Sequence, residues 1–164
     1  MSNVILVDEK DNILGEISRE KAHQEGLLHR ISVIYLINEK KEILVNERAM
    51  DGHLDHSSAG HVDVGESYLE AAKRELYEEL GVSNIDLIEL GFATASDVYD
   101  NLKSNHMMKI FVCKAKPVNI NHEEVKSIFW SNPINILSDM DINPNKYAGG
   151  FRSSIKIILK YLEK

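Results

Sequence analysis

The chain has 164 residues, of which 43% are hydrophobic and 27% are charged. This length and balance are typical of one globular domain with its own core, and they exclude an intrinsically disordered chain. The formal net charge of −7 disfavours binding to nucleic acid or to an anionic membrane surface. No apolar run approaches the length of a transmembrane helix. We therefore expect a single domain over residues 1–164 that binds neither nucleic acid nor membranes.

Two further features bear on the cellular compartment. Cys113 is the only cysteine of the sequence, so an internal disulfide is excluded. The N-terminus has neither the positively charged start nor the apolar core of a secretory signal. Both features favour a cytoplasmic location. Because Cys113 stands in an apolar segment, we interpret it as an inert core thiol.

The N-terminal third contains a predicted hairpin, a short helix and a second pair of strands. Apolar residues over 4–7 and 13–17 flank a polar turn, which predicts two antiparallel strands. A serine cap and a following glycine predict a short helix over 18–25. Residues 31–37, which are almost all apolar, and 42–48, which contain the apolar run 43–45, are predicted to be two strands joined by a polar turn.

The rest of the chain continues the mixture of strands and helices. Its predicted strands are 85–94, 106–115 and 127–130, and its predicted helices are 67–80, 133–140 and 151–163. The polar segment 95–105 is predicted to be a loop between two of these strands. This order of elements favours the α+β class, with a mixed β-sheet between helices.

The segment 60–82, GHVDVGESYLEAAKRELYEELGV, contains the most specific pattern of the chain. Ser67 and Glu70 fit a capping box, and Gly81 fits a helix end, so the helix should begin at Ser67. At about 100° per residue, an apolar stripe forms on one side of this helix. The stripe is predicted to consist of Leu69, Ala72, Leu76 and Leu80.

Three carboxylates gather on a neighbouring face of the same helix. Glu75, Glu78 and Glu79 stand at i, i+3 and i+4, so their like charges repel each other. A hard divalent cation such as Mg²⁺, which prefers oxygen ligands, would remove this repulsion and bring a phosphate with it. Arg74 is placed to orient the carboxylates. Gly60 is small enough for a backbone carbonyl to approach the same ion.

The complete pattern, G-x5-E-x7-R-E-U-x-E-E-x-G-U, resembles the Nudix box. The positions that match are Gly60, Glu66, Arg74, Glu75, Leu76, Glu78, Glu79, Gly81 and Val82. The resemblance implies a Nudix α/β/α sandwich and a hydrolase that uses Mg²⁺ or Mn²⁺ and a metal-activated water to cleave a nucleoside diphosphate linked to another group. It implies that Glu75, Glu78 and Glu79 are metal ligands or the general base, supported by Glu66 and Arg74. The backbone of Gly60 is expected to complete the metal site.

The first half of the chain also resembles the isopentenyl-diphosphate isomerase branch of the Nudix superfamily. The resemblance rests on Val7-Asp8-Glu9, Gly15, His23, the segment 26–30 and the segment 57–61. It implies that residues 1–30 form an N-terminal extension of hairpin and short helix. In these isomerases a cysteine just before the box glycine exchanges a proton with the allylic carbon. Here that position is Ala59, so we favour hydrolysis over isomerisation.

Three histidines match the metal-site histidines of the isomerases, namely His23, His29 and His61. The nearest matches to the acids that complete the isomerase site are Ser104 and His106. Two interpretations stay open. The histidines are either relics packed in a core, or they hold a second metal or contact phosphate. His61 is accordingly a candidate substrate-binding residue.

Some residues outside the box are further candidates. Glu124, favoured over Glu123, resembles the acidic residue that adds a ligand or a general base in some Nudix enzymes. Arg48 ends a strand near the site and is either a phosphate ligand or part of a surface salt bridge. Specificity is expected to come from the segments 49–58, 95–105 and 143–150.

The sequence leaves three functions open. The first is a hydrolase of nucleoside diphosphate derivatives or related organic pyrophosphates. The others are an isopentenyl-diphosphate isomerase-like protein and a binding module for a nucleotide ligand without catalysis. In each case the partner is a small-molecule diphosphate. The oligomeric state is open, and a homodimer, common among relatives, is one candidate.

Overall fold

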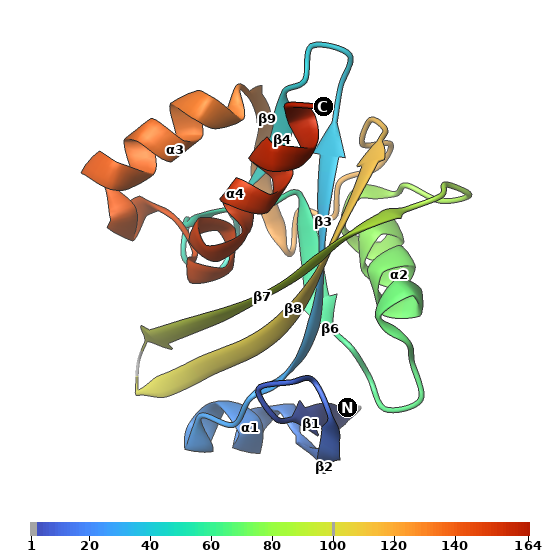
Figure 1. The fold of residues 1–164 in the computed structure, drawn as a ribbon, viewed down its shortest axis with the longest axis vertical. Helices are drawn as coiled ribbons and strands as arrows, with labels where there is room; N and C mark the ends of the chain where they lie inside the picture. Colours follow the sequence, from blue (N-terminus) through green and yellow to red (C-terminus); the bar gives the residue numbers. More distant parts are fainter. Residues whose placement is uncertain (1–2, 100) are drawn as a thin grey trace.

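The computed structural model describes residues 3–99 and 101–164, and residues 1, 2 and 100 lie outside this part. A large curved sheet runs through the molecule, with helices on both of its faces (Figure 1). Its strands are β1 (Asn3–Val7), β2 (Ile13–Ser18), β3 (His29–Ile37), β4 (Ile43–Arg48), β5 (Leu54–Asp55), β6 (Ser58–His61), β7 (Ile88–Tyr99), β8 (Leu102–Lys114) and β9 (Val125–Ser131). The helices are α1 (Arg19–Glu25), α2 (Tyr68–Leu80), α3 (Pro133–Ile142) and α4 (Gly149–Leu162), with a short 3-10 helix, η1 (Pro144–Lys146).

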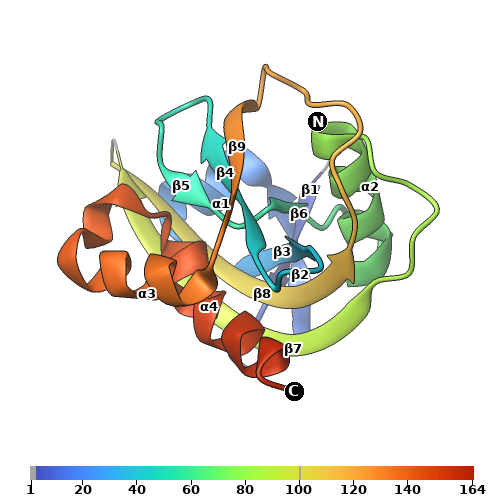
Figure 2. The same cartoon turned by 90° about the horizontal axis from the view of Figure 1, so that it is seen from above.

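Strand β3 is the centre of the sheet. It pairs in parallel with β8 along its whole length and antiparallel with β1, β4 and β6. Nearly all of its residues are buried, because helices cover both faces of the sheet. The helix α2 lies on one face and the pair α3 and α4 on the other (Figure 2). The predicted α+β class with a mixed sheet between helices is therefore confirmed.

Most predicted elements are present with small shifts at their ends. The N-terminal hairpin, α1, β3, β4, β9, α3 and α4 all occur where the sequence predicts them. The helix α1 begins after Ser18, whose side chain accepts a hydrogen bond from the backbone N–H of Lys21, and it ends at Gly26 in the left-handed region. Two short strands, β5 and β6, were not predicted. No helix in the part of the chain described above has the length and apolar character needed to cross a bilayer.

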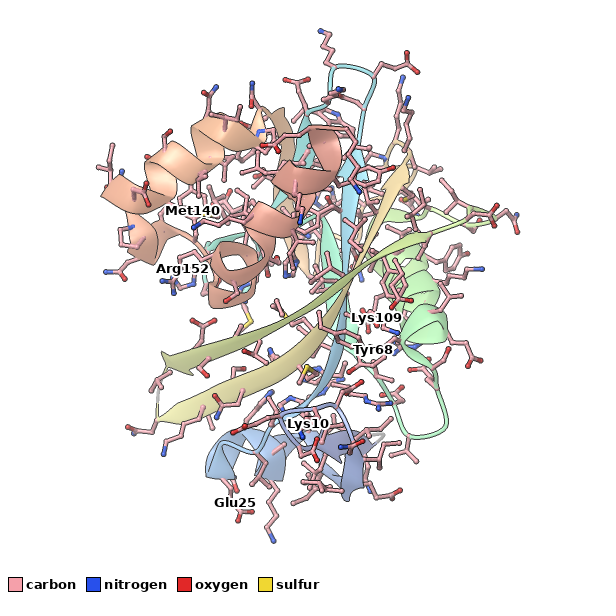
Figure 3. The ribbon with its side chains drawn as sticks, in the orientation of Figure 1. Lys10, Glu25, Tyr68, Lys109, Met140 and Arg152 are labelled. Carbon is pink, nitrogen blue, oxygen red and sulfur yellow. The ribbon has the colours of Figure 1, made fainter. Side chains whose placement is uncertain are left out.

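The helix α2 begins and ends as predicted, but its buried face includes different residues. Both hydrogen bonds of the capping box between Ser67 and Glu70 are present, and Gly81 adopts φ 71°. Leu69 was predicted to face the core and is 40% exposed. Tyr68 takes its place, because Tyr68, Ala72, Leu76 and Leu80 form one row at a spacing of four residues. Lys109 of β8 lies over the Tyr68 ring at 5.0 Å (Figure 3).

The prediction of a loop over 95–105 is wrong, because β7 and β8 form one long hairpin through this segment. Ala95 pairs with His106, and the pairing continues to Tyr99 and Leu102. Two of its polar side chains bond to other elements. Asp97 accepts a hydrogen bond from the backbone N–H of Gly149, and Asn105 donates one to the carbonyl oxygen of Gly26. Polarity therefore reflects tertiary contacts here and not an irregular backbone.

Candidate active site

A cavity of about 500 Å³ opens between β4, β6, α2 and the far half of the β7–β8 hairpin. Glu75 and Glu79 of α2 line one side of it, and Glu123 and Glu124, from the turn before β9, join them. All three segments in which specificity was expected contribute to its wall. Segment 49–58 supplies Asp55 and His56, segment 95–105 supplies Asp97 and Ser104, and segment 143–150 supplies Ala148 and Gly150.

Gly60 of β6 brings the strand into close contact with α2. A Cβ atom built on Gly60 would lie 2.0 Å from Cδ of Glu75 and 2.2 Å from its Oε1. Only glycine leaves room for the buried Glu75 carboxylate at this point. The structure therefore shows a close contact of Gly60 with the side chain of Glu75. The approach of a backbone carbonyl at Gly60 to a metal stays a prediction.

Glu79 is fixed from the other side by β6. Its Oε1 accepts hydrogen bonds from the hydroxyl of Ser58 and, at 3.1 Å, from the backbone N–H of Ala59. Burial, together with the neighbouring Glu75 and Glu124, nevertheless raises the pKa of Glu79 to about 8. The methyl group of Ala59 lines the cavity, so no titrating side chain stands where the isomerases have their cysteine.

Arg74 orders the acidic residues of the box. Its Nε and Nη2 form a two-pronged pair with Glu66 at 2.8 and 2.9 Å. Its Nη1 donates to Glu75 at 2.8 Å, and Nη2 also donates to the carbonyl oxygen of His61 at 3.0 Å. Burial raises the pKa of Glu75 to about 7, although the Arg74 guanidinium opposes this. A supporting role of Arg74 and Glu66 in catalysis stays a prediction.

The structure brings together Glu75, Glu79 and Glu124, each with a carboxylate oxygen within 4.8 Å of the others. The sequence favoured Glu124 over Glu123, and it is Glu124 that joins the group. Glu78 does not join it. Its side chain is 49% exposed and lies 3.5 Å from Nη1 of Arg74. A metal or catalytic role for Glu78 therefore stays a prediction.

The acidic group fits a hard divalent cation. All of its ligand atoms are carboxylate oxygens, which Mg²⁺ and Mn²⁺ prefer. The pKa values of Glu75 and Glu79 are raised by burial and by the neighbouring carboxylates. This shows that the negative charges are unfavourable in the protein alone. A cation between the carboxylates would remove that penalty.

Arg48 lies in the cavity wall as part of a salt-bridge cluster. Its guanidinium pairs with Asp51, and it lies 3.6 Å from Asp55. The salt-bridge alternative is therefore confirmed, and a phosphate contact by Arg48 stays a prediction. Asn46 and His56 also line the cavity, and Oδ1 of Asn46 and Nδ1 of His56 are buried without a hydrogen-bond partner in the described part of the chain. Nothing in the sequence singled out either residue.

The three histidines taken from the isomerase resemblance also converge. His23, His29 and His61 meet His106, with ligand nitrogens within 4.8 Å of one another. Ser104, the other residue matched to the isomerase acids, lines the cavity but is not in this group. A direct phosphate contact by His61 stays a prediction, because its ring faces the other histidines.

Comparison with known proteins agrees with this geometry. Residues 27–148 match the model of the NUDIX domain. The chain is 32% identical over 160 residues to an isopentenyl-diphosphate Δ-isomerase of Serratia proteamaculans, covering 93% of this chain and 89% of that one. It is 30% identical over 144 residues to a protein of Yersinia pestis named an uncharacterized Nudix hydrolase, covering 84% of this chain and 77% of that one.

Among solved structures, DR0079 from Deinococcus radiodurans superposes with a TM-score of 0.69 at 25% identity, over 96% of this chain and 97% of that one. The likeness thus extends beyond the box to the whole arrangement of sheet and helices. The box residues, the fold and the match to the domain model agree, and the chain belongs to the Nudix hydrolase family of enzymes.

Proposed function

We propose that the protein is a Mg²⁺-dependent hydrolase that cleaves a phosphoanhydride bond in a nucleoside diphosphate derivative or a related organic pyrophosphate. The convergence of Glu75, Glu79 and Glu124 on one cavity carries this proposal. A chain of net charge −7 needs a cation to hold a negative diphosphate beside three carboxylates. The same cation, when bound, would neutralise the charge that develops on the phosphate oxygens during cleavage.

The protein's own groups would position the reactants and take up a proton. Ser58 and Ala59 hold Oε1 of Glu79, and Arg74 holds Oε1 of Glu75. In each case Oε2 is the oxygen left for a cation or a water. Carboxylates with a raised pKa are suited to general-base catalysis near neutral pH. Glu75, Glu79 and Glu124 all remain candidates for the base that removes a proton from the attacking water.

A second candidate is an isopentenyl-diphosphate isomerase-like activity, which the Serratia relative favours. Such an isomerisation moves a proton at carbon and releases no phosphate. Ala59 argues against it, because a methyl group in the cavity wall has no proton to exchange.

The decisive test is a Mg²⁺-dependent screen of purified protein. It includes nucleoside triphosphates, ADP-ribose, NADH, nucleotide sugars, dinucleoside polyphosphates and isopentenyl diphosphate. Glu79→Gln should lower turnover by about 100-fold or more. As a control, Glu163→Gln, a substitution at an exposed residue near the C-terminus, should leave turnover unchanged.

Each outcome of the screen assigns a function. Phosphoanhydride cleavage, seen as a nucleoside monophosphate with a second phosphate ester or as free phosphate or diphosphate, and lost in Glu79→Gln, supports the hydrolase and identifies its substrate class. An allylic isomer formed without phosphate release would establish the isomerase. Thermal stabilisation by one compound with no turnover would establish a binding module and overturn the proposal.

A further inference from the structure

The four histidines form a cluster beside the acidic group but separate from it. His23 comes from α1, His29 from β3, His61 from β6 and His106 from β8. His29 and His106 are paired in register across the parallel strands, with ring centroids 4.7 Å apart. The rings of His29 and His61 stack at 5.1 Å with an interplanar angle of 3°.

All four imidazoles present a nitrogen with no partner. The Nε2 atoms of His23, His29, His61 and His106 are buried, and none has a hydrogen-bond partner in the described part of the chain. His29 itself is fully buried. Its Nδ1 lies 2.8 Å from the carbonyl oxygen of Leu27, which can only accept. Nδ1 therefore carries the proton, and Nε2 presents a lone pair to the cluster.

Burial lowers the pKa of all four histidines and so favours their neutral rings. Four neutral imidazoles whose nitrogens converge without partners are unusual, because buried polar atoms are normally bonded. A cation that accepts their lone pairs satisfies them together, and neutral imidazole is the form that binds metals.

We propose that His23, His29, His61 and His106 form a second metal centre, which binds a transition ion of the Zn²⁺ class through four nitrogens. Among the described residues, this group consists of histidines alone and contains no carboxylate. The positive charge of Arg19 lies close enough to lower the pKa of His23, His29 and His61. Affinity must therefore come from imidazole ligation and not from negative charge. This chemistry excludes Mg²⁺ and suits Zn²⁺ and its neighbours.

The ligand set also indicates what the ion does. Four protein ligands complete a tetrahedral Zn²⁺ shell and leave no position for water, which is typical of a structural site. The isomerases that the chain resembles use acids where this chain has Ser104 and His106, so the two centres are chemically different. The ion would join α1 to three strands of the sheet. It would thus fasten the N-terminal segment beside the cavity that His23, His61 and His106 also line.

The experiment measures ion binding directly. Metal-free protein is dialysed against Zn²⁺ or Co²⁺ with Mg²⁺ in excess, the bound ion is counted, and the visible spectrum of Co²⁺ is recorded. One ion per chain is expected, with the intense absorption of four-coordinate Co²⁺. His106→Ala and His23→Ala should each lower the affinity by more than about 10-fold, since even residues that only support ligands have effects of that size.

Matched variants separate this centre from the acidic one. His122→Ala, an exposed histidine outside the cluster, and Glu79→Gln should both retain the ion. Zn²⁺ should raise the melting temperature of the wild type but not of His106→Ala. The metal-free forms of both should have the same circular dichroism. If His106→Ala does not fold, His23→Gln on the half-exposed side of α1 replaces it.

The proposal is overturned by any of three results. These are no retained Zn²⁺ or Co²⁺, a six-coordinate Co²⁺ spectrum, or binding that is lost in Glu79→Gln and kept in His106→Ala. None of them affects the proposed hydrolysis, which is assigned by Mg²⁺-dependent turnover. Conversely, a protein without turnover that still binds Zn²⁺ through the histidines would leave this centre in place.

Discussion

The acidic site depends on the absence of a side chain at Gly60 as much as on the carboxylates. Gly60 allows β6 to pass over Glu75 with no Cβ between them. The same strand then presents Ser58 and Ala59 to Glu79. A single close approach thus positions both glutamates of α2 that reach the cavity.

We expect Gly60→Ala to weaken both folding and metal binding. The added methyl would lie 2.0 Å from Cδ of Glu75, and overpacking of this kind costs about 1–3 kcal/mol. Urea denaturation and a Mg²⁺ titration measure the two effects. In the control, Gly65→Ala, the added methyl meets open space, so only its backbone strain at φ 90° should lower stability. Unchanged Mg²⁺ affinity in Gly60→Ala would contradict this role.

The raised pKa values predict that Mg²⁺ binding depends on pH. Without the ion, Glu75 has a pKa of about 7 and Glu79 of about 8, because burial disfavours their charged forms. A carboxylate must lose its proton to bind a cation, so protons compete at low pH. Affinity should therefore rise as the pH increases from about 6 to about 9, with proton release on binding.

Calorimetry in buffers of different ionisation enthalpy measures that proton release. Glu79→Gln removes one of the two titrating groups, so the slope of affinity against pH should become shallower. An affinity that is flat over this range in the wild type would show that the carboxylates are already ionised in the metal-free protein.

At the level of elements, α4 begins without a capping side chain of its own. Its N-cap is Ala148, which cannot accept a hydrogen bond through its side chain. Asp97 of β7 supplies the acceptor instead, at 3.0 Å from the backbone N–H of Gly149. It also lies 3.7 Å from Arg152 in the first turn of α4. The long hairpin therefore stabilises a helix that follows 52 residues later.

Replacing this distant cap should destabilise the protein. We expect Asp97→Ala to cost about 1 kcal/mol, as for loss of an ordinary N-cap. Asp97→Asn keeps an acceptor but loses the charge–dipole attraction, about 0.3–1 kcal/mol, and the exposed ion pair with Arg152, about 0–1 kcal/mol. Chemical denaturation measures both, with the exposed Asp86→Ala as control. Equal stability of Asp97→Ala and wild type would show that water caps the helix equally well.

At the level of the whole molecule, β3 joins two separate cores. Alternate side chains enter the core under α3 and α4 and the core under α2. A buried polar contact fixes the first of these layers. Tyr35 of β3 lies 2.6 Å from the hydroxyl of Ser154 in α4. Because Ser154 gives its proton to the carbonyl oxygen of Gly150 at 2.7 Å, Tyr35 is the donor in this pair.

The direction of this bond predicts unequal effects of its two deletions. Tyr35→Phe leaves Ser154 bonded to Gly150 and should cost about 1 kcal/mol. Ser154→Ala leaves a buried phenol hydroxyl without its acceptor and should cost about 1–3 kcal/mol. Urea denaturation of the two variants and of the double variant tests the order. A larger loss in Tyr35→Phe would mean that the bond runs the other way.

Local signals in the sequence were enough to predict several elements. The boundaries of α2 depend on Ser67, Glu70 and Gly81, whose hydrogen bonds lie within the helix or next to it. The central strand β3 could be predicted because it is buried on both faces, so its residues form one continuous apolar run in the sequence. The box residues and the family also follow from the sequence, because the spacing of Glu75 and Glu79 on one helix is local.

Only the tertiary structure decided which side chains meet. Helical periodicity places Glu78 beside Glu75 and Glu79, but the approach of β6 selects the i and i+4 pair and leaves Glu78 half-exposed beside Arg74. The fourth histidine, His106, reaches the other three through the parallel pairing of β3 and β8, which joins segments far apart in the chain. Such pairing depends on long-range packing, so no local pattern determines it.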